Sequence, residues 1–255
     1  MAELNNNISE YESALTDARH KDAMNVLQLC VKRILDIVGA ILGLLVCSPL
    51  ILFVVIALLL EHDGPVIFSQ ERIGYKGRPF TIYKFRSMKT NAEENGIPRL
   101  DSERAAHLTK VGTFLRNHHL DELPQLWNVL KGDMSFVGPR PERQYFIDQI
   151  SQHTDEYRFV YLMRPGLSSK ATLYNGYTDT MEKMLTRLKM DLEYLETRSL
   201  SVDFGICLFL KLSDYLILCT NTGFGYLILC GRTRMFFDRA YNIFCLYIFR
   251  HLITS

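Results

Sequence analysis

The 255-residue sequence has no excess of either charge, because 29 Lys and Arg against 28 Asp and Glu leave a formal net charge of +1. Such a chain lacks the strongly basic surface of a general nucleic-acid-binding protein, so nucleic acid is not an expected partner and any anion site must be local. The six cysteines include no Cys-x-x-Cys pair, and the chain is too long and too apolar for a disulfide-stabilised secreted scaffold. We therefore expect reduced cysteines that pack as small hydrophobic side chains.

The first 23 residues contain no apolar stretch of the kind that a secretory signal requires. They are mainly polar, with Asn, Asp, Glu and Ser mixed among isolated apolar residues. Residues 1–30 are interpreted as a leader that is frayed or only partly helical.

The next segment has the opposite character, since residues 34–60 are an apolar run whose only charged residue is Asp36. A straight helix of this length would extend roughly 40 Å at about 1.5 Å per residue, which exceeds the roughly 30 Å hydrocarbon core of a bilayer. Ser48-Pro49 lies in the middle of the run, where proline removes a backbone donor and clashes with the preceding turn. We expect the helix to kink or break there.

Beyond the apolar run, short extended segments and tight turns predict a small separate domain over residues 63–203. Residues 66–70 and 80–86 have strand-like composition and are joined through a glycine-containing turn, which predicts a β-hairpin. Residues 123–130 and 179–198 are predicted helices. Residues 204–255 are an apolar tail in pieces too short to span a bilayer, which favours membrane-associated amphipathic helices in the interface.

The segment around Asp121-Glu122-Leu123-Pro124 is the most informative for chemistry. Proline is tolerated in a first helical turn, so a helix is predicted to begin near Leu120 or Asp121, with both acids at the positive end of its dipole. The acids could serve only to complement that dipole on a solvated surface. Alternatively, Asp121 is a nucleophile and Glu122 a magnesium ligand, because phosphoryl transfer needs an ionised carboxylate and cations that offset phosphate charge.

Several basic side chains are candidates for binding phosphate. Arg140 lies between two prolines in Gly138-Pro139-Arg140-Pro141, so its backbone is restrained and its guanidinium suits bidentate phosphate recognition, unless it only fixes a loop. Strand alternation places Lys84 and Arg86 on one face, where they form either a phosphate site or a solvated edge. His118-His119 is a weak zinc motif, because neighbouring side chains point apart and the spacing places no third ligand.

These segments follow one another in the order of the motifs of a known family. The motifs are Lys32-Arg33-Ile34-Leu35-Asp36, Ser48-Pro49, Gly64-Pro65-Val66-Ile67-Phe68, Gln70-Glu71-Arg72-Ile73-Gly74, Tyr83-Lys84-Phe85-Arg86-Ser87-Met88, Leu120-Asp121-Glu122-Leu123-Pro124-Gln125-Leu126-Trp127-Asn128-Val129, Gly132-Asp133-Met134-Ser135, Val137-Gly138-Pro139-Arg140-Pro141 and Arg164-Pro165-Gly166. Through them, residues 31–211 resemble the bacterial sugar transferase family. Its members are monotopic polyprenyl-phosphate phosphoglycosyl transferases that initiate capsule, exopolysaccharide or glycoprotein glycan assembly.

The resemblance implies a ping-pong reaction with Mg²⁺ as cofactor, which moves a sugar-1-phosphate from a UDP-sugar to polyprenol (undecaprenyl) phosphate and releases UMP. It also implies that Asp121 resembles the nucleophile that becomes a phosphosugar-enzyme, and that Glu122 resembles its metal-binding partner. Arg116 and Arg140 resemble the arginines that organise phosphates, and Lys84 with Arg86 resemble substrate-site cations. Expected partners are the two substrates and membrane lipids, at the cytoplasmic face of a bacterial inner membrane.

The flanks of the apolar run bear on its topology. Lys32-Arg33 precedes the run, which predicts a cytoplasmic location for that end. A nucleotide-activated substrate is also cytoplasmic, so residues 31–62 are predicted to enter and leave on one side as a re-entrant helix hairpin broken at Ser48-Pro49, which the family likewise implies. An ordinary kinked transmembrane helix is the alternative. The predicted fold is therefore α+β: this hairpin, a small mainly helical cytoplasmic domain with a short β-hairpin, and interfacial amphipathic helices.

Two functions without catalysis compete with the transferase. The chain could be a membrane-anchored protein that only binds a nucleotide-sugar, or an anchored scaffold. The adjacent Asp121 and Glu122 and the restrained Arg140 favour the enzyme, because a scaffold needs none of them.

Overall fold

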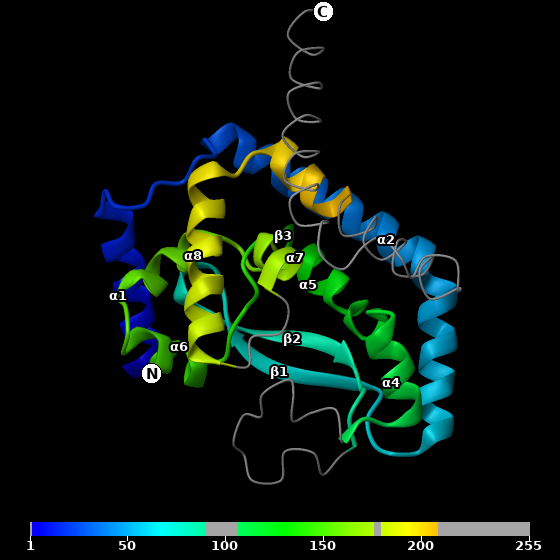
Figure 1. Cartoon of the computed structure of the whole chain (residues 1–255). Helices are drawn as coiled ribbons and strands as arrows, with labels where there is room; N and C mark the ends of the chain where they lie inside the picture. Colours follow the sequence, from blue (N-terminus) through cyan, green and yellow to red (C-terminus); the bar gives the residue numbers. More distant parts are fainter. Residues whose placement is uncertain (1, 90–106, 176–179, 209–255) are drawn as a thin grey trace, which may run out of the picture. The chain divides into compact units, whose positions relative to one another are not determined.

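The computed structural model describes residues 2–89, 107–175 and 180–208. The chain divides into two compact units, Met1–Arg198 and Ser199–Ser255. In the second unit, residues 200–208 are helical, and the rest of the predicted apolar tail lies outside the described residues. The first unit is a mixed α and β domain together with one long apolar helix (Figure 1).

One helix, α2 (Val26–Glu61), contains the whole apolar run. It continues through Pro49, and the Ser48 hydroxyl donates a hydrogen bond to the Leu45 carbonyl at 2.8 Å. Figure 1 shows that α2 bends part-way along its length, as expected when a proline and a back-bonded serine weaken the backbone ladder. The change of direction expected at Ser48-Pro49 is therefore a bend within one helix, and no break separates two helices. The re-entrant topology stays a prediction.

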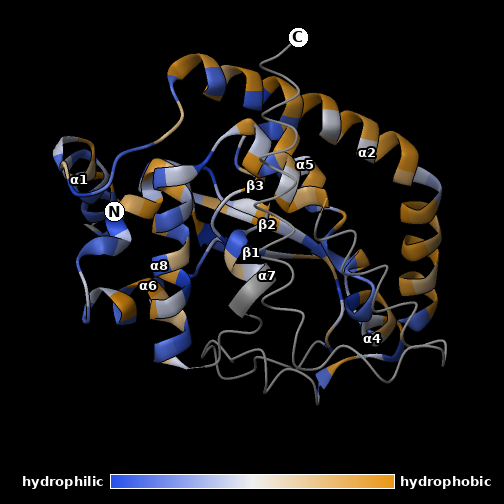
Figure 2. Cartoon of the chain, turned by 45° about the horizontal axis from the view of Figure 1, so that its top comes forward, coloured by the Kyte–Doolittle hydropathy of each residue, from blue (hydrophilic) through white to orange (hydrophobic). Residues whose placement is uncertain are grey.

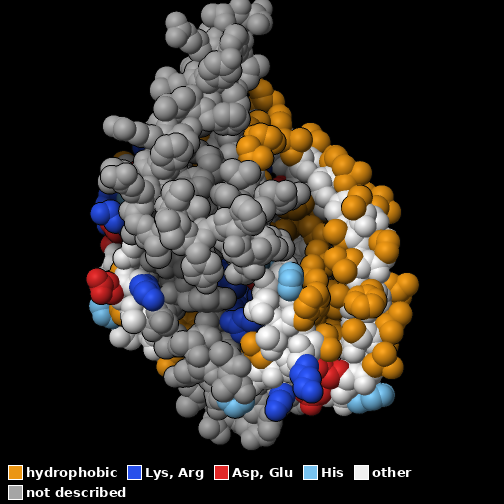
Figure 3. All heavy atoms as spheres, turned by 45° about the vertical axis from the view of Figure 1, so that its right-hand side comes forward, with side chains coloured by type: hydrophobic (Ala, Val, Ile, Leu, Met, Phe, Trp, Pro, Cys, Tyr) orange, Lys and Arg blue, Asp and Glu red, His pale blue; other side chains and the backbone are white. Residues whose placement is uncertain are grey.

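Most of the α2 surface is apolar and exposed (Figures 2 and 3). Only 11% of its most apolar stretch is buried, and α2 is long and apolar enough to cross a membrane. Its exposed hydrophobic side chains include Ile34, Leu35, Val38, Leu42, Leu45, Val46, Leu52 and Phe53. A contiguous apolar surface of this extent marks an interaction with a membrane or a partner, and the length and composition of α2 favour the membrane.

The first turns of α2 bind the short strand β3 (Ser135–Val137). Asp36 is buried and accepts hydrogen bonds from the Ser135 hydroxyl and the Phe136 N–H, both at 3.1 Å. The Lys32 ammonium is also buried and donates to the Val137 carbonyl at 3.1 Å. The charges at the start of the apolar run therefore hold α2 to the domain.

The last turns of α2 bind the same domain at another place. Val54 and Leu58 pack with Phe85 and Leu115 in one buried cluster. The Glu61 carboxylate accepts a hydrogen bond at 3.2 Å from the backbone N–H of Val111, the second residue of α4 (Lys110–Asn117). Both ends of α2 are consequently fixed to one small domain.

The predicted β-hairpin is confirmed. Strands β1 (Ile67–Ile73) and β2 (Pro79–Phe85) pair antiparallel over their full length. A 3-10 turn, η1 (Tyr75–Gly77), joins them, and its Lys76 and Gly77 have positive φ angles of 62° and 67°. Such angles close the tight connection between the strands.

The helix predicted at residues 123–130 is α5 (Gln125–Lys131), which packs on β2 and on α2. It begins later than expected, because Asp121 and Glu122 belong to a separate 3-10 turn, η3 (Leu120–Glu122), that precedes it. Arg33 of α2 donates to the Val129 and Leu130 carbonyls at 2.7 and 2.9 Å. A cation at the C-terminal end of a helix complements its dipole and its unpaired carbonyls.

The remaining elements complete the first unit. They are α1 (Ala2–Thr16), α6 (Gln144–Ser151), η4 (Glu156–Leu162), β4 (Gly166–Ser168), α7 (Lys170–Asn175) and α8 (Met181–Thr197). α8 agrees with the helix predicted at 179–198, and its Tyr194 is buried. The leader is more ordered than expected, because ion pairs such as Arg158 with Asp17 at 2.7 Å fasten it to the domain.

Candidate active site

The adjacent carboxylates lie where three elements converge. Asp121 and Glu122 are in η3, directly before α5, and Asp121 is only 7% exposed. Lys84 approaches from β2, and its ammonium lies 2.6 Å from Glu122 Oε1. Arg140 approaches from the turn after β3, with its guanidinium 3.5 Å from the same oxygen. Residues far apart in sequence therefore form one cluster of opposite charges.

The two carboxyl groups differ in their pKa values. Burial alone would raise the pKa of Glu122, but the charges of Lys84 and Arg140 outweigh it and lower that pKa to about 2. Burial raises the pKa of Asp121 above its usual value; the charges of Lys84 and Arg116 oppose this rise and that of Glu122 adds to it. Burial also lowers the pKa of Lys84, against the attraction of Glu122. Glu122 is thus ionised throughout the physiological range, whereas Asp121 is the more basic carboxylate.

The turn that carries Arg140 is held by backbone pairing. β3 and β4 form a parallel pair, which continues where the Gly166 N–H donates to the Pro139 carbonyl at 2.9 Å and the Gly138 N–H donates to the Ser168 carbonyl at 3.0 Å. A Cβ atom at Gly138 would lie 2.2 Å from the Arg164 carbonyl oxygen. Gly138 is therefore required for the close approach of two backbones, and its φ is not positive.

Charged side chains also fix the residue after the turn. Glu142 is buried and forms ion pairs with Arg187 of α8 and, at 3.5 Å, with Arg72 of β1. A small cavity of about 10 Å³ lies behind Arg140, and Asp191 contributes to its wall. Burial raises the pKa of Asp191 to about 7, although Arg187 opposes the rise. The Arg140 turn is consequently anchored on two sides.

The remaining predicted cations occupy different places. Arg116, on α4, lies near enough to Asp121 to oppose the rise of its pKa. Arg86 is not in the cluster, because β2 ends at Phe85 and the Arg86 side chain is buried against the end of α2. Its guanidinium donates to the carbonyls of Gly64 and, at 3.1 Å, Leu58. This placement gives Arg86 a structural role and does not support contact with substrate.

Glu122 suits a magnesium ion. Lys84 and Arg140 both contact Oε1, and Asp121 supplies a second carboxylate next to it. Within the described parts of the chain, no group of three or more His, Cys, Asp or Glu side chains could hold a metal ion. Magnesium commonly takes one or two carboxylates and completes its coordination with water and substrate phosphates, so this donor set fits.

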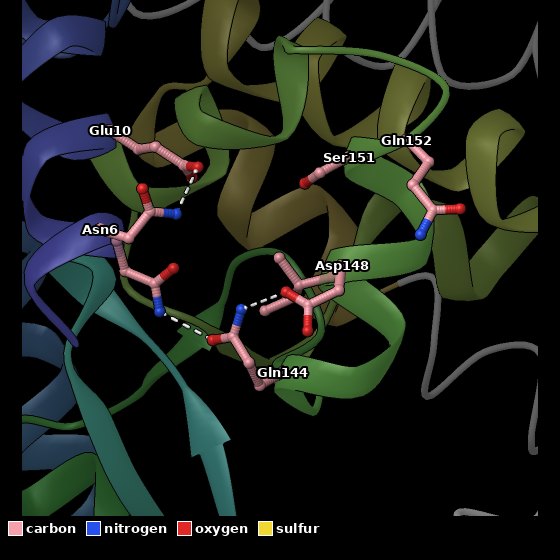
Figure 4. A pocket seen from close by; sticks show the side chains of 8 residues that line it. Asn6, Glu10, Gln144, Asp148, Ser151 and Gln152 are labelled. Atoms are coloured by element: carbon pink, nitrogen blue, oxygen red, sulfur yellow. Dashed lines mark hydrogen bonds between the residues drawn. The ribbon is translucent and has the colours of Figure 1, made fainter. Parts of the chain in front are cut away.

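A larger cavity lies away from the charged cluster. It has a volume of about 220 Å³ between α1 and α6 and is lined mainly by polar side chains (Figure 4). Within it, Asn7 donates to Gln144 at 2.8 Å and Gln144 donates to Asp148 at 2.7 Å. Its walls contain no residue of the Asp121 cluster, so the cavity is not part of this site.

Sequence reasoning overlooked Asn128. Its side chain is fully buried in α5, and its amide is hydrogen-bonded to the backbone of β2. The available signal was an amide between the apolar residues Leu126, Trp127, Val129 and Leu130. A buried amide of this kind requires partners.

The fold and the cluster define a class of protein: a membrane-associated α+β domain with a carboxylate pair among cations, which is suited to a phosphorylated ligand. A model of the family described as bacterial sugar transferase matches residues 27–212. The chain belongs to this family.

Several named relatives are similar over about two thirds of the chain. A UDP-N-acetylgalactosamine-undecaprenyl-phosphate N-acetylgalactosaminephosphotransferase of Aeromonas hydrophila is 39% identical over 68% of this chain and 41% of its own length. Two UDP-glucose:undecaprenyl-phosphate glucose-1-phosphate transferases are each 42% identical over 69% of this chain; they come from Escherichia coli, where 38% of the relative is covered, and from Caulobacter vibrioides, where 67% is covered. The chain therefore spans about two fifths of the length of the first two relatives.

Proposed function

We propose that the protein is a phosphoglycosyl transferase that moves a sugar-1-phosphate from a UDP-sugar to polyprenol phosphate. The observation that carries the proposal is the assembly of Lys84 and Arg140 around the adjacent carboxylates of η3. Family membership supports it, because the relatives named above use UDP-sugars and undecaprenyl phosphate. Initiation of a cell-surface polysaccharide or glycan is the role that these activities imply.

The first chemical step forms a bond between a carboxylate oxygen of Asp121 and the β-phosphorus of the UDP-sugar. The bond from that phosphorus to the bridging oxygen breaks, and UMP leaves with the electron pair. Burial favours this role for Asp121, because a more basic carboxylate is the better nucleophile. Arg140 is restrained by its turn and can bind the phosphate oxygens with two parallel hydrogen bonds.

The second step transfers the phosphosugar to lipid. An oxygen of the polyprenol phosphate attacks the same phosphorus, and the Asp121 carboxylate leaves. Dividing the transfer into two steps lets a soluble donor and a lipid acceptor use one site in turn. Glu122 would hold magnesium, which offsets the negative charge of the diphosphate, and Lys84 orients the Glu122 carboxylate.

We propose that α2 enters and leaves the membrane on the cytoplasmic side. Asp36 near its start and Glu61 at its end both bind the same domain. A straight helix across a bilayer would separate these two positions by the full hydrocarbon thickness of roughly 30 Å. The bend in α2 and its two attachments to one domain therefore support insertion from one face (Figure 1).

The mechanism predicts a covalent intermediate. The protein incubated with UDP-sugar in the absence of lipid acceptor should release UMP, and mass spectrometry should find hexose-phosphate on the peptide that contains Asp121. Asp121→Asn should abolish both signals because an amide is not a nucleophile here. UMP release that occurs only with acceptor present, with no adduct trapped, would establish direct displacement instead.

The topology can be tested by cysteine labelling. Cys30 is exposed and precedes the apolar run, and Ser69 is exposed on β1 beyond it. A variant with Cys30 as its sole cysteine and a second one with only Ser69→Cys should react with a membrane-impermeant maleimide from the same side of sealed vesicles. Labelling from opposite sides would show that α2 spans the membrane.

A further inference from the structure

The ion pair between Lys84 and Glu122 joins two elements that are far apart in the sequence. Lys84 belongs to β2, whereas Glu122 belongs to the 3-10 turn before α5. The nitrogen to oxygen distance of 2.6 Å in this ion pair depends on how η3, and the helix α5 that follows it, lie along β2. β2 pairs with β1 on one edge only, and no other described strand pairs with its second edge.

The side chain of Asn128 occupies that second edge. Its Oδ1 accepts a hydrogen bond from the Tyr83 N–H at 3.1 Å, and its Nδ2 donates to the Thr81 carbonyl at 2.7 Å. One residue of a parallel neighbouring strand makes this same pair of bonds with residues i and i+2 of its partner. The carboxamide therefore replaces one backbone unit of a missing strand, beside the residue that precedes Lys84.

The backbone of Asn128 fixes the opposite end of the site. Its carbonyl accepts hydrogen bonds from the N–H groups of Gly132, Asp133 and Met134 at 3.1, 3.1 and 3.2 Å. These residues lead directly into β3 and on to the turn of Arg140. Asn128 is also 0% exposed, so water cannot replace any of its partners.

We propose that Asn128 is a positioning residue, which fixes the register of α5 on β2 and thereby holds Lys84 against Glu122. Asn128 is six positions after Glu122, which corresponds to roughly 9 Å at about 1.5 Å per helical residue. Tyr83 is the immediate neighbour of Lys84. Both connections from the amide to the ion pair are therefore short, and loss of the amide moves the two charges apart.

The first test measures the position of Lys84 without relying on catalysis. The full chain in detergent is treated with sulfo-NHS-acetate, and mass spectrometry gives the acetylation rate of Lys84 relative to Lys131, whose side chain is 54% exposed. Asn128→Ala should raise this ratio about tenfold, because the hydrogen bonds of the Asn128 amide to β2, which keep Lys84 paired, are lost. Val129→Ala, a buried neighbour that makes no side-chain hydrogen bond, is the matched control and should leave the ratio unchanged.

The second test rests on the proposed function and uses UMP release at saturating UDP-sugar. Asn128→Ala should reduce the rate about a hundredfold, as a displacement near 1 Å can do, whereas Val129→Ala should not, even at equal loss of thermal stability. In a Lys84→Met background, Asn128→Ala should cause only a small further loss, because the contact that it positions is already absent.

The outcomes distinguish failure of the positioning role of Asn128 from failure of the proposed transferase function. Equal acetylation ratios in Asn128→Ala and Val129→Ala, or rate losses that multiply in the double variant, overturn the positioning role. If the wild-type chain releases no UMP, the proposed function fails while the acetylation ratio still decides the role of Asn128. If Asn128→Ala does not fold, Asn128→Asp is used in its place. The aspartate keeps an acceptor for the Tyr83 N–H but replaces the donor to the Thr81 carbonyl with a second acceptor, which repels it. The acetylation ratio of this variant must also rise.

Discussion

Replacing Asp36 by alanine should detach the start of α2 from the domain. Asp36 is 4% exposed and accepts two hydrogen bonds, from the Ser135 hydroxyl and the Phe136 N–H. Asp36→Ala leaves both buried donors without their Asp36 acceptor. Because β3 leads into the turn of Arg140, the same change should also reduce UMP release.

The magnitude follows from the two bonds. Hydrogen bonds to a charged group contribute about 1.5 to 3 kcal/mol each, and the avoided burial of a carboxylate offsets part of their loss. We expect the free energy of unfolding to fall by about 2 to 4 kcal/mol. For a domain of this size, the melting temperature should then fall by about 5 to 15 °C.

Thermal unfolding in detergent, monitored by the single tryptophan, measures the effect. Glu12→Gln is the control, because Glu12 is exposed and such changes usually alter stability by less than about 0.5 kcal/mol. Ser135→Ala alone should cost about 1 kcal/mol, and it should add little to Asp36→Ala, because the two variants remove the same bond. A melting temperature for Asp36→Ala equal to that of Glu12→Gln would refute the attachment of α2 through this carboxylate.

Two further predictions concern charge. Arg86→Met should lower the melting temperature, because it removes the donors for Leu58 and Gly64 and the buried partner of Glu61, yet the folded fraction should keep the wild-type KM for UDP-sugar in initial-rate assays. The lowered pKa of Glu122 stabilises the fold above its ordinary value near 4.5, and this stabilisation is lost as the pH falls toward about 2. The difference in unfolding free energy between wild type and Glu122→Gln should therefore shrink from pH 5 to pH 3 in denaturant titrations.

Local sequence patterns predicted the elements that local interactions form. The β-hairpin follows from two strand-like segments joined by a tight turn, and α8 follows from apolar residues at helical spacing. The start of α5 was predicted too early, near Leu120 or Asp121, because the residues before α5 already have helical angles. Pro124 precedes the first residue of the α-helix, whereas Asp121 lies in the separate turn η3. The boundary between a 3-10 turn and an α-helix depends on whether each N–H bonds to the carbonyl three or four residues earlier.

Long-range pairing was beyond the sequence patterns. β3 and β4 have three residues each and are joined through a connection that contains α6 and η4, so neither has enough length to show a period. Alternation along the strand did not predict that Arg86 lies outside the charged cluster, because β2 ends at Phe85 and the Arg86 side chain contacts the end of α2. The partners of Arg86 include the Leu58 and Gly64 carbonyls as well as the Glu61 carboxylate, and backbone acceptors leave no trace in the sequence.

The adjacent acids of η3 show how one environment can give two roles. Burial acts on both carboxyl groups and would raise both pKa values. Lys84 forms an ion pair with Glu122 at 2.6 Å, and Arg140 adds a second positive charge at 3.5 Å. Lys84 opposes the rise in the pKa of Asp121 by electrostatic attraction, without a hydrogen bond. The pKa values consequently move in opposite directions, which in two-carboxylate sites separates a permanently ionised group from a more basic one. A metal ligand needs the first property and a nucleophile benefits from the second, so the position of Lys84 supports the roles proposed above for Glu122 and Asp121.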